Sequence, residues 1–174
     1  MKPAIAFAAL ALAAAPAAAQ QQQQQGFQAK DFVQQAIQDN IADVEAGRIA
    51  QSIQTADPAV QQLGQRITAS SIEMNGDLAK LAQRMNVPVT NQLVPDDRQA
   101  LDRMAKMQGQ QFSRDYVGYV ISDLRQDIEM YQQAAAQAED PMLAHFARQV
   151  LPTLQETYAM AQQVQEQQTA QQPR

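Results

Sequence analysis

The sequence predicts an all-α protein built as a four-helix bundle. Ala, Gln, Leu, Met, Arg and Glu dominate the chain, and most of these residues favour helices. Gly and Pro are scarce inside the long stretches of helical periodicity, and β-branched residues never cluster as strands require. A length of 174 residues suits one domain once the ends are set aside.

The N-terminus has the features of a cleaved signal peptide. Lys2 supplies a positive charge, and an apolar run from Ala4 to Ala15 follows, which is too short to span a bilayer. Ala17 and Ala19 then form a small-x-small cleavage pattern with no Cys after it. We therefore expect a signal peptide over residues 1–19 and a periplasmic or secreted mature protein; an uncleaved anchor is the alternative.

Both ends of the expected mature chain are rich in Gln. Such tracts bury no apolar surface, so we expect a disordered linker over residues 20–28 and a disordered tail over residues 166–174. The helical bundle domain is expected over residues 29–165. No further segment is apolar enough to span a membrane.

Apolar residues at helical spacing predict four long helices, at about residues 29–54, 58–85, 111–138 and 141–165. Asp57-Pro58 and Asp140-Pro141 mark the starts of the second and fourth, because Asp is a good N-cap and Pro fits the first helical position. Pro152 lies inside the fourth helix and is expected to kink it.

The connection between the second and third helices is far longer than either hairpin loop. It covers about residues 86–110, contains Pro88 and Pro95, and has room for a short helix from Asp96 to about Met107. A connection of this length can return along the bundle, as in ferritin-like folds, which would make the second and third helices parallel. An up-down-up-down bundle is the alternative if the connection folds locally.

A polar layer is predicted near the middle of the bundle. Glu45 interrupts an apolar row on the first helix, and Ser71 and Thr157 interrupt rows on the second and fourth; Leu124 holds the matching position on the third. In one interpretation the hydroxyls bond to their own helix backbones and Glu45 turns to solvent. In the other, the four residues form a polar pocket or the remnant of a site.

Several short motifs resemble the bacterial family called domain of unknown function 4142, over roughly residues 27–164. They include Glu45-Ala46-Gly47-Arg48-Ile49-Ala50 on the first helix, Asn75 with Leu78 on the second, Gly109 with Phe112 and Tyr116 at the third, and Phe146-Ala147 with Leu151-Pro152-Thr153-Leu154 on the fourth. The resemblance implies an exported, ferritin-like bundle.

The departures from the family pattern fall on the predicted layer. The resemblance places the family's three His at Ser71, Leu124 and Thr157, so that only Glu45 remains of a family metal site of one Glu and three His. A lone carboxylate does not hold zinc or iron tightly. We therefore expect no metal in this layer and no cofactor in the protein.

Composition and motifs argue against several other functions. The net charge of −5 argues against nucleic-acid binding, and the absence of Cys excludes thiolate sites. His145 is expected at the surface, while Met104 and Met107 are expected to pack rather than bind Cu(I). The sequence favours a non-enzymatic envelope protein that binds an unidentified protein or envelope partner. A metal-binding ferritin-like protein and a periplasmic holdase are the alternatives.

Overall fold

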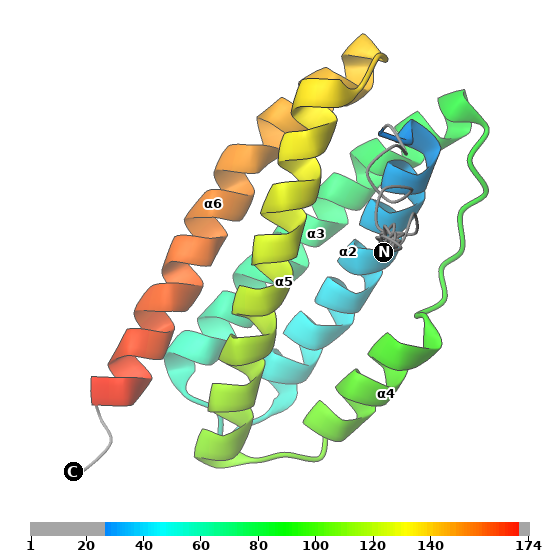
Figure 1. Ribbon diagram of the computed structural model, residues 1–174. Helices are drawn as coiled ribbons and strands as arrows, with labels where there is room; N and C mark the ends of the chain where they lie inside the picture. Colours follow the sequence, from blue (N-terminus) through cyan, green and yellow to red (C-terminus); the bar gives the residue numbers. More distant parts are fainter. Residues whose placement is uncertain (1–26, 171–174) are drawn as a thin grey trace, which may run out of the picture.

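The computed structural model describes residues 27–170, and every regular element within them is a helix. Five helices follow one another along the chain (Figure 1): α2 (Ala29–Ser52), α3 (Pro58–Met85), α4 (Pro95–Met104), α5 (Gly109–Gln137) and α6 (Pro141–Ala170). The all-α fold class is thus confirmed. The predicted signal peptide, residues 20–26 of the linker and residues 171–174 of the tail lie outside the described residues.

The two Asp-Pro pairs start helices, as predicted. An Asp57 carboxylate oxygen accepts a hydrogen bond from the Ala59 N–H at 2.8 Å, and Pro58 occupies the first turn of α3. Asp140 accepts from the N–H groups of Met142 and Leu143 at 2.9 and 3.0 Å. Each carboxylate therefore satisfies N–H groups that have no partner within the helix.

Some helix ends differ from the prediction. α2 ends at Ser52 and α5 begins at Gly109. The tail that was expected to be disordered from residue 166 is instead helical as far as Ala170, and α6 is assigned as one helix through Pro152. Gln and Ala are good helix formers, so a Gln-rich end can extend a helix that is already nucleated by packing.

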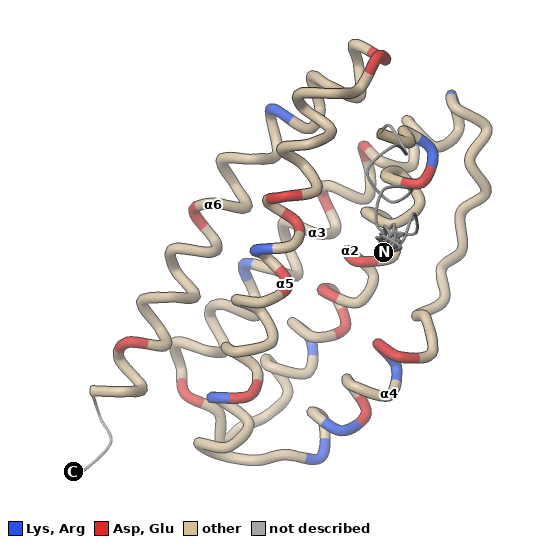
Figure 2. Tube along the Cα trace, in the orientation of Figure 1, with Lys and Arg blue, Asp and Glu red and all other residues tan. Residues whose placement is uncertain are grey.

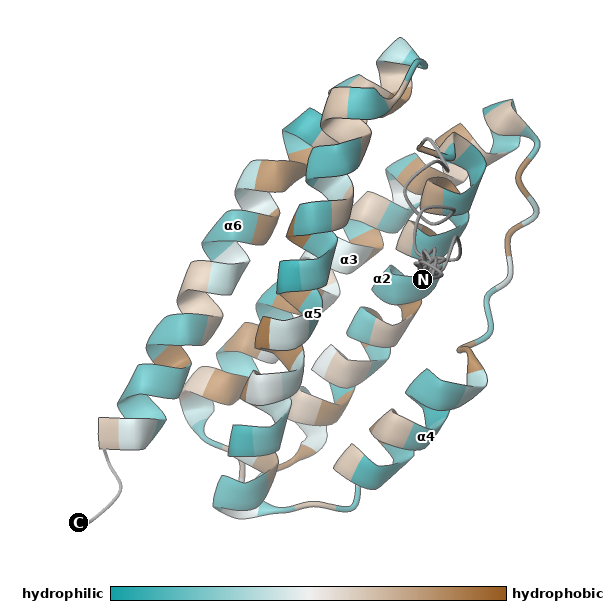
Figure 3. Ribbon diagram, viewed as in Figure 1, coloured by the Kyte–Doolittle hydropathy of each residue, from teal (hydrophilic) through white to brown (hydrophobic). Residues whose placement is uncertain are grey.

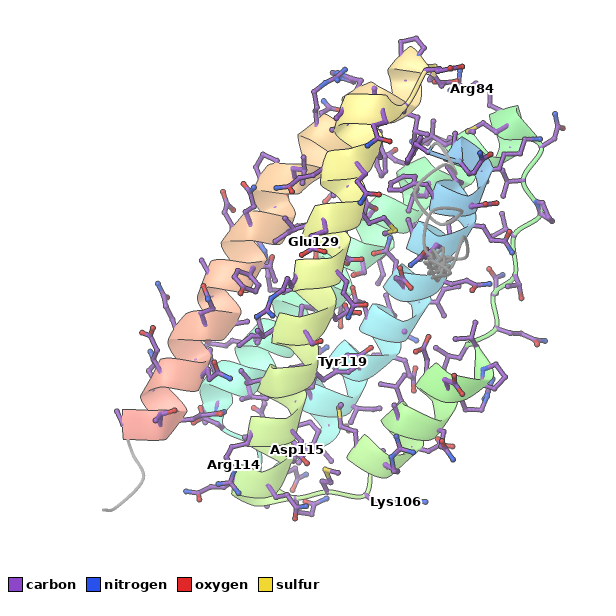
Figure 4. The ribbon with its side chains drawn as sticks, in the orientation of Figure 1. Arg84, Lys106, Arg114, Asp115, Tyr119 and Glu129 are labelled. Atoms are coloured by element: carbon purple, nitrogen blue, oxygen red, sulfur yellow. The ribbon has the colours of Figure 1, made fainter. Side chains whose placement is uncertain are left out.

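Helices α3 and α5 run in the same direction (Figure 1). The Asp57 N–H, at the start of α3, donates to the Ser113 hydroxyl near the start of α5 at 3.0 Å. Arg84, near the end of α3, binds Asp140 beyond the end of α5 at 2.7 Å (Figure 4). The segment between Asn86 and Gln108, which contains α4, therefore returns along the length of the helices.

Apolar residues fill the space between the four long helices, where hydrophobic positions recur along each of them (Figure 3). Leu63, Leu78 and Leu143 are fully buried, and the Phe32 ring meets Tyr131 edge-on with centroids 5.1 Å apart. No helix within residues 27–170 is long and apolar enough to cross a bilayer.

Two glycines allow α2 and α3 to approach closely. A Cβ placed at Gly64 would lie 2.9 Å from the Gly47 carbonyl oxygen and 2.8 Å from the Ala50 Cβ. Both neighbours belong to packed helix structure, so they have little freedom to move. The α2–α3 hairpin therefore depends on the absence of side chains at this crossing.

Gly64→Ala is expected to lower the free energy of unfolding by about 1–3 kcal/mol, because its methyl group would overpack the crossing. Gly118, inside α5, is the matched control, since a Cβ there meets nothing within 4 Å. Gly118→Ala should stabilise by about 0.5–1 kcal/mol through helix propensity. Urea unfolding of both variants checks the prediction, and equal effects would contradict it.

Candidate carboxylate site between helices α2 and α5

The structure does not bring the predicted polar layer together. Ser71, Leu124 and Thr157 are buried, but the Glu45 side chain is 45% exposed and pairs with Arg48 at 3.8 Å. The Thr157 hydroxyl donates to the Thr153 carbonyl of its own helix at 2.8 Å, and Leu124 belongs to the apolar core. The prediction that Glu45 lies in this layer is therefore wrong.

A different carboxylate of α2 enters the interior. Asp43 is only 4% exposed, and the Ser71 hydroxyl donates to it at 3.1 Å. Two residues along an α-helix turn it by about 200°, so Asp43 and Glu45 point to opposite sides of α2. Ser71 thus connects the predicted layer with the acidic site that the structure contains.

Three carboxylates meet in the seam between α2 and α5. Asp43 comes from α2, and Asp123 and Asp127 come from α5; one oxygen from each lies within 4.8 Å of the others. Asp127 is also only 4% exposed, while Asp123 is half-buried. We call these three residues the acidic cluster.

Helical spacing places these residues in one seam. Asp39 and Asp43 are four residues apart on α2, as are Asp123 and Asp127 on α5, so each pair lies on one face of its helix. Figure 2 shows acidic positions near the middle of both helices. The two helices run in opposite directions, which brings each pair alongside the other.

Burial and mutual repulsion favour the protonated forms of these carboxyl groups. Burial raises the pKa of Asp43, and the charge of Asp127 adds to the rise. Burial and then the charge of Asp43 raise the pKa of Asp123, and burial and then Asp123 raise that of Asp127. Within residues 27–170, no Lys or Arg forms an ion pair with the cluster. Its negative charge therefore has no compensating cationic side chain.

Polar side chains surround the cluster on three helices. Asn40 donates to the Asn75 side chain at 3.2 Å and interacts with the Tyr131 hydroxyl. The Tyr119 side chain lies on the α5 side that faces α2 (Figure 4), and burial and then the charge of Asp123 raise its pKa. Tyr116 is fully buried, and its hydroxyl has no hydrogen-bond partner among the described residues.

Helix α4 lies against the outer side of this seam. It packs on α2 and α5 through Leu101 and Met104, which are buried. Its Asp97 lies close enough to Asp39 to raise the pKa of that carboxyl, which burial and Asp97 together bring to about 6. The long connection therefore covers the carboxylates and adds a further acid at their edge.

The donor atoms of the cluster suit a hard cation. Carboxylate oxygens, a Ser hydroxyl and water are ligands that Mg²⁺, Mn²⁺ and Ca²⁺ prefer. His145 is exposed on α6 beside Lys80 and Arg84 and takes no part, while Met104 packs in the core. The expectation of no metal was made for the predicted polar layer, in which Glu45 is the one carboxylate. The acidic cluster is a different set of residues and has three carboxylates.

One signal in the sequence could have revealed the cluster. Asp39–Asp43 and Asp123–Asp127 are acidic pairs at a spacing of four, and none of the four has a Lys or Arg three or four residues away. On an exposed helix face, like charges at this spacing are mildly destabilising. Two such uncompensated pairs on neighbouring helices indicate a shared site.

The chain belongs to the family described as a domain of unknown function (DUF4142), which matches residues 12–164. A search of curated proteins gave no match. The fold is similar to the crystal structure of a DUF305 fragment from Deinococcus radiodurans, with a TM-score of 0.69 and 15% sequence identity over 80% of this chain and 95% of that one. At this identity the likeness shows the fold alone.

The metal-free protein is expected to lose stability as the pH rises from 5 to 9. The pKa is raised to about 6 at Asp39, about 7 at Asp43 and about 9 at Asp123, whereas an unfolded Asp titrates near about 4. The folded state therefore holds more protons in this range, and its advantage disappears as they are removed.

Thermal unfolding in chelator at several pH values checks this prediction. Asp43→Asn and Asp123→Asn should each flatten the decline, because each removes a carboxylate from the coupled group. Asp115→Asn, at an exposed position of α5, is the control and should leave the slope unchanged. A wild-type protein as stable at pH 9 as at pH 5 would contradict the prediction.

Proposed function

We propose that this protein is an exported, non-enzymatic helical bundle that binds a hard divalent cation through Asp43, Asp123 and Asp127. The observation that carries the proposal is the meeting of two buried carboxylates and one half-buried carboxylate from two helices, without a compensating Lys or Arg within residues 27–170. Metal binding is thus the best supported of the functions that the sequence left open.

Electrostatics supports a cation at this position. A buried carboxylate must be paired, protonated or bound to a metal, because removing its charge from water is costly. A divalent cation would compensate two of the three charges and accept one oxygen from each residue. Ser71 already donates to Asp43, which holds that carboxylate in place.

The class of cation follows from the ligands. Mn²⁺, Mg²⁺ and Ca²⁺ bind oxygen donors, whereas zinc and copper sites usually include His or Cys. Three carboxylates leave positions for water in a six-coordinate shell. The low exposure of Asp43 and Asp127 leaves little space for an organic substrate, which supports binding rather than catalysis.

Two further parts of the proposal concern fold type and location. The parallel course of α3 and α5, together with the returning connection, supports a ferritin-like four-helix bundle. The charged start, apolar run and Ala17-x-Ala19 pattern support export to the periplasm or medium. A cation centre in an exported protein would serve storage, buffering or structural stabilisation in the bacterial envelope.

Cation binding is tested by calorimetric titration of the metal-free protein with Mn²⁺, Mg²⁺ and Ca²⁺. We expect saturable binding of at least one of them, and Asp123→Asn should weaken it by at least about 10-fold because a ligand charge is lost. Asp115→Asn leaves the same helix with one acid fewer at an exposed position, so it should bind like the wild type. Equal binding by both variants would show that the cation sits elsewhere.

Export is tested by N-terminal sequencing of the protein recovered from the envelope fraction of expressing bacteria. The expected first residue is Gln20, because Ala17 and Ala19 match the small residues that signal peptidase recognises. Ala19→Arg should block cleavage and leave the longer form. Recovery of a chain that begins at Met1 from wild-type cells would contradict the proposal.

A further inference from the structure

Tyr116 has the one buried side-chain polar atom within residues 27–170 that lacks a hydrogen-bond partner. Its side chain is fully buried and stacks on Phe112, with ring centroids 5.7 Å apart. A buried hydroxyl without a partner is destabilising, and native structures rarely keep one without a reason. The surroundings of this hydroxyl therefore indicate what it binds.

The position of the Tyr116 hydroxyl follows from its contact with Gly64 of α3. Asp57 and Ser113 lie side by side at the starts of the parallel helices α3 and α5. Gly64 follows Asp57 by seven residues and Val120 follows Ser113 by seven residues, so Gly64 and Val120 lie at about the same height in the bundle. A Cβ at Gly64 would be 3.4 Å from the Tyr116 hydroxyl oxygen. The hydroxyl therefore lies at the crossing of Gly47 and Gly64, where α2 and α3 approach each other.

This crossing lies about one helical turn from Asp43 of the acidic cluster. Asp123 follows Tyr116 by seven residues, or about two turns, so both side chains lie on the same face of α5. Asp43 lies one turn from Gly47, whose carbonyl oxygen lies at the same crossing as Gly64. After burial, Asp43 and then Asp123 are the charges that raise the pKa of Tyr116.

We infer that Tyr116 forms the floor of the cation site and donates its hydroxyl hydrogen to a water molecule bound to the cation. This inference rests on the proposed cation-binding function. The cation would then keep at least one water ligand on the side of Tyr116, while Asp43, Asp123 and Asp127 bind it directly. Tyr116 is a positioning residue, because it acts through that water.

The arrangement gives Tyr116 opposite effects in the two states of the protein. Without metal, its hydroxyl is a buried donor with no acceptor among the described residues. With metal, the bound water supplies an oxygen acceptor, and such outer-shell contacts commonly contribute to metal affinity. A residue that only fills space would stabilise both states alike.

Tyr116→Phe removes the hydroxyl and keeps the ring that packs on Phe112. The metal-free variant should be as stable as the wild type or more so in thermal unfolding, while calorimetry with Mn²⁺ should show affinity reduced by about 10-fold. Tyr158→Phe, on α6, is the control and should change neither measurement. Lower stability of metal-free Tyr116→Phe, or unchanged Mn²⁺ affinity, would overturn the inference.

Terbium luminescence provides a direct measurement of the water. Tb³⁺ is a hard cation that prefers oxygen ligands, and the chain contains no Trp, so Tyr is the sensitising group. Emission lifetimes in H₂O and D₂O should show at least one coordinated water in the wild type, and sensitised emission should fall in Tyr116→Phe. Binding of Tb³⁺ or Mn²⁺ without coordinated water would overturn the inference but not the proposed function, whereas a wild type that binds no cation would overturn both.

Discussion

Repulsion between carboxylates in the seam of α2 and α5 is the main unfavourable interaction that this structure must accommodate. Asp43, Asp123 and Asp127 hold their oxygens within 4.8 Å of one another in surroundings that raise the pKa of each. Either protonation or the binding of a cation would relieve this repulsion. Because protonation depends on pH, we expect the stability of this protein to depend on pH, and the proposed cation binding would add a dependence on the metal that is available.

Contacts elsewhere in the fold keep α2 and α5 together despite this repulsion. The Gly47–Gly64 crossing draws α2 against α3, and α5 packs along α6. Arg84 ties the end of α3 to Asp140, and the Asp57 backbone ties its start to Ser113. The Arg84 and Asp57 contacts lie at the two ends of α3, so they hold the two hairpins together at positions away from the cluster. The long connection then places α4 over the outer side of the seam.

The helices could be predicted from the sequence because their signals are local. An Asp-Pro pair caps a helix wherever it occurs, and apolar spacing needs no knowledge of the neighbouring helix. The acidic cluster depends on which faces meet. The row Ile37–Ile41–Glu45–Ile49 advances by four residues and drifts around α2, so it does not follow one buried face, and the Glu45 side chain is 45% exposed. The burial of Asp43 could not be predicted from α2 alone, because it depends on how α5 packs against this helix.

Ser71 shows how the resemblance to the family and the acidic cluster are related. The resemblance places a family His at position 71, and the structure places the Ser71 hydroxyl 3.1 Å from Asp43. An imidazole there would stand next to Asp43 and offer nitrogen to a metal, which favours borderline metals such as zinc or copper. In this chain the hydroxyl instead orients a carboxylate, and the remaining donors are oxygen. Under the proposed function, replacement of His by Ser would favour a hard cation over a borderline metal, because only oxygen donors remain in the acidic cluster.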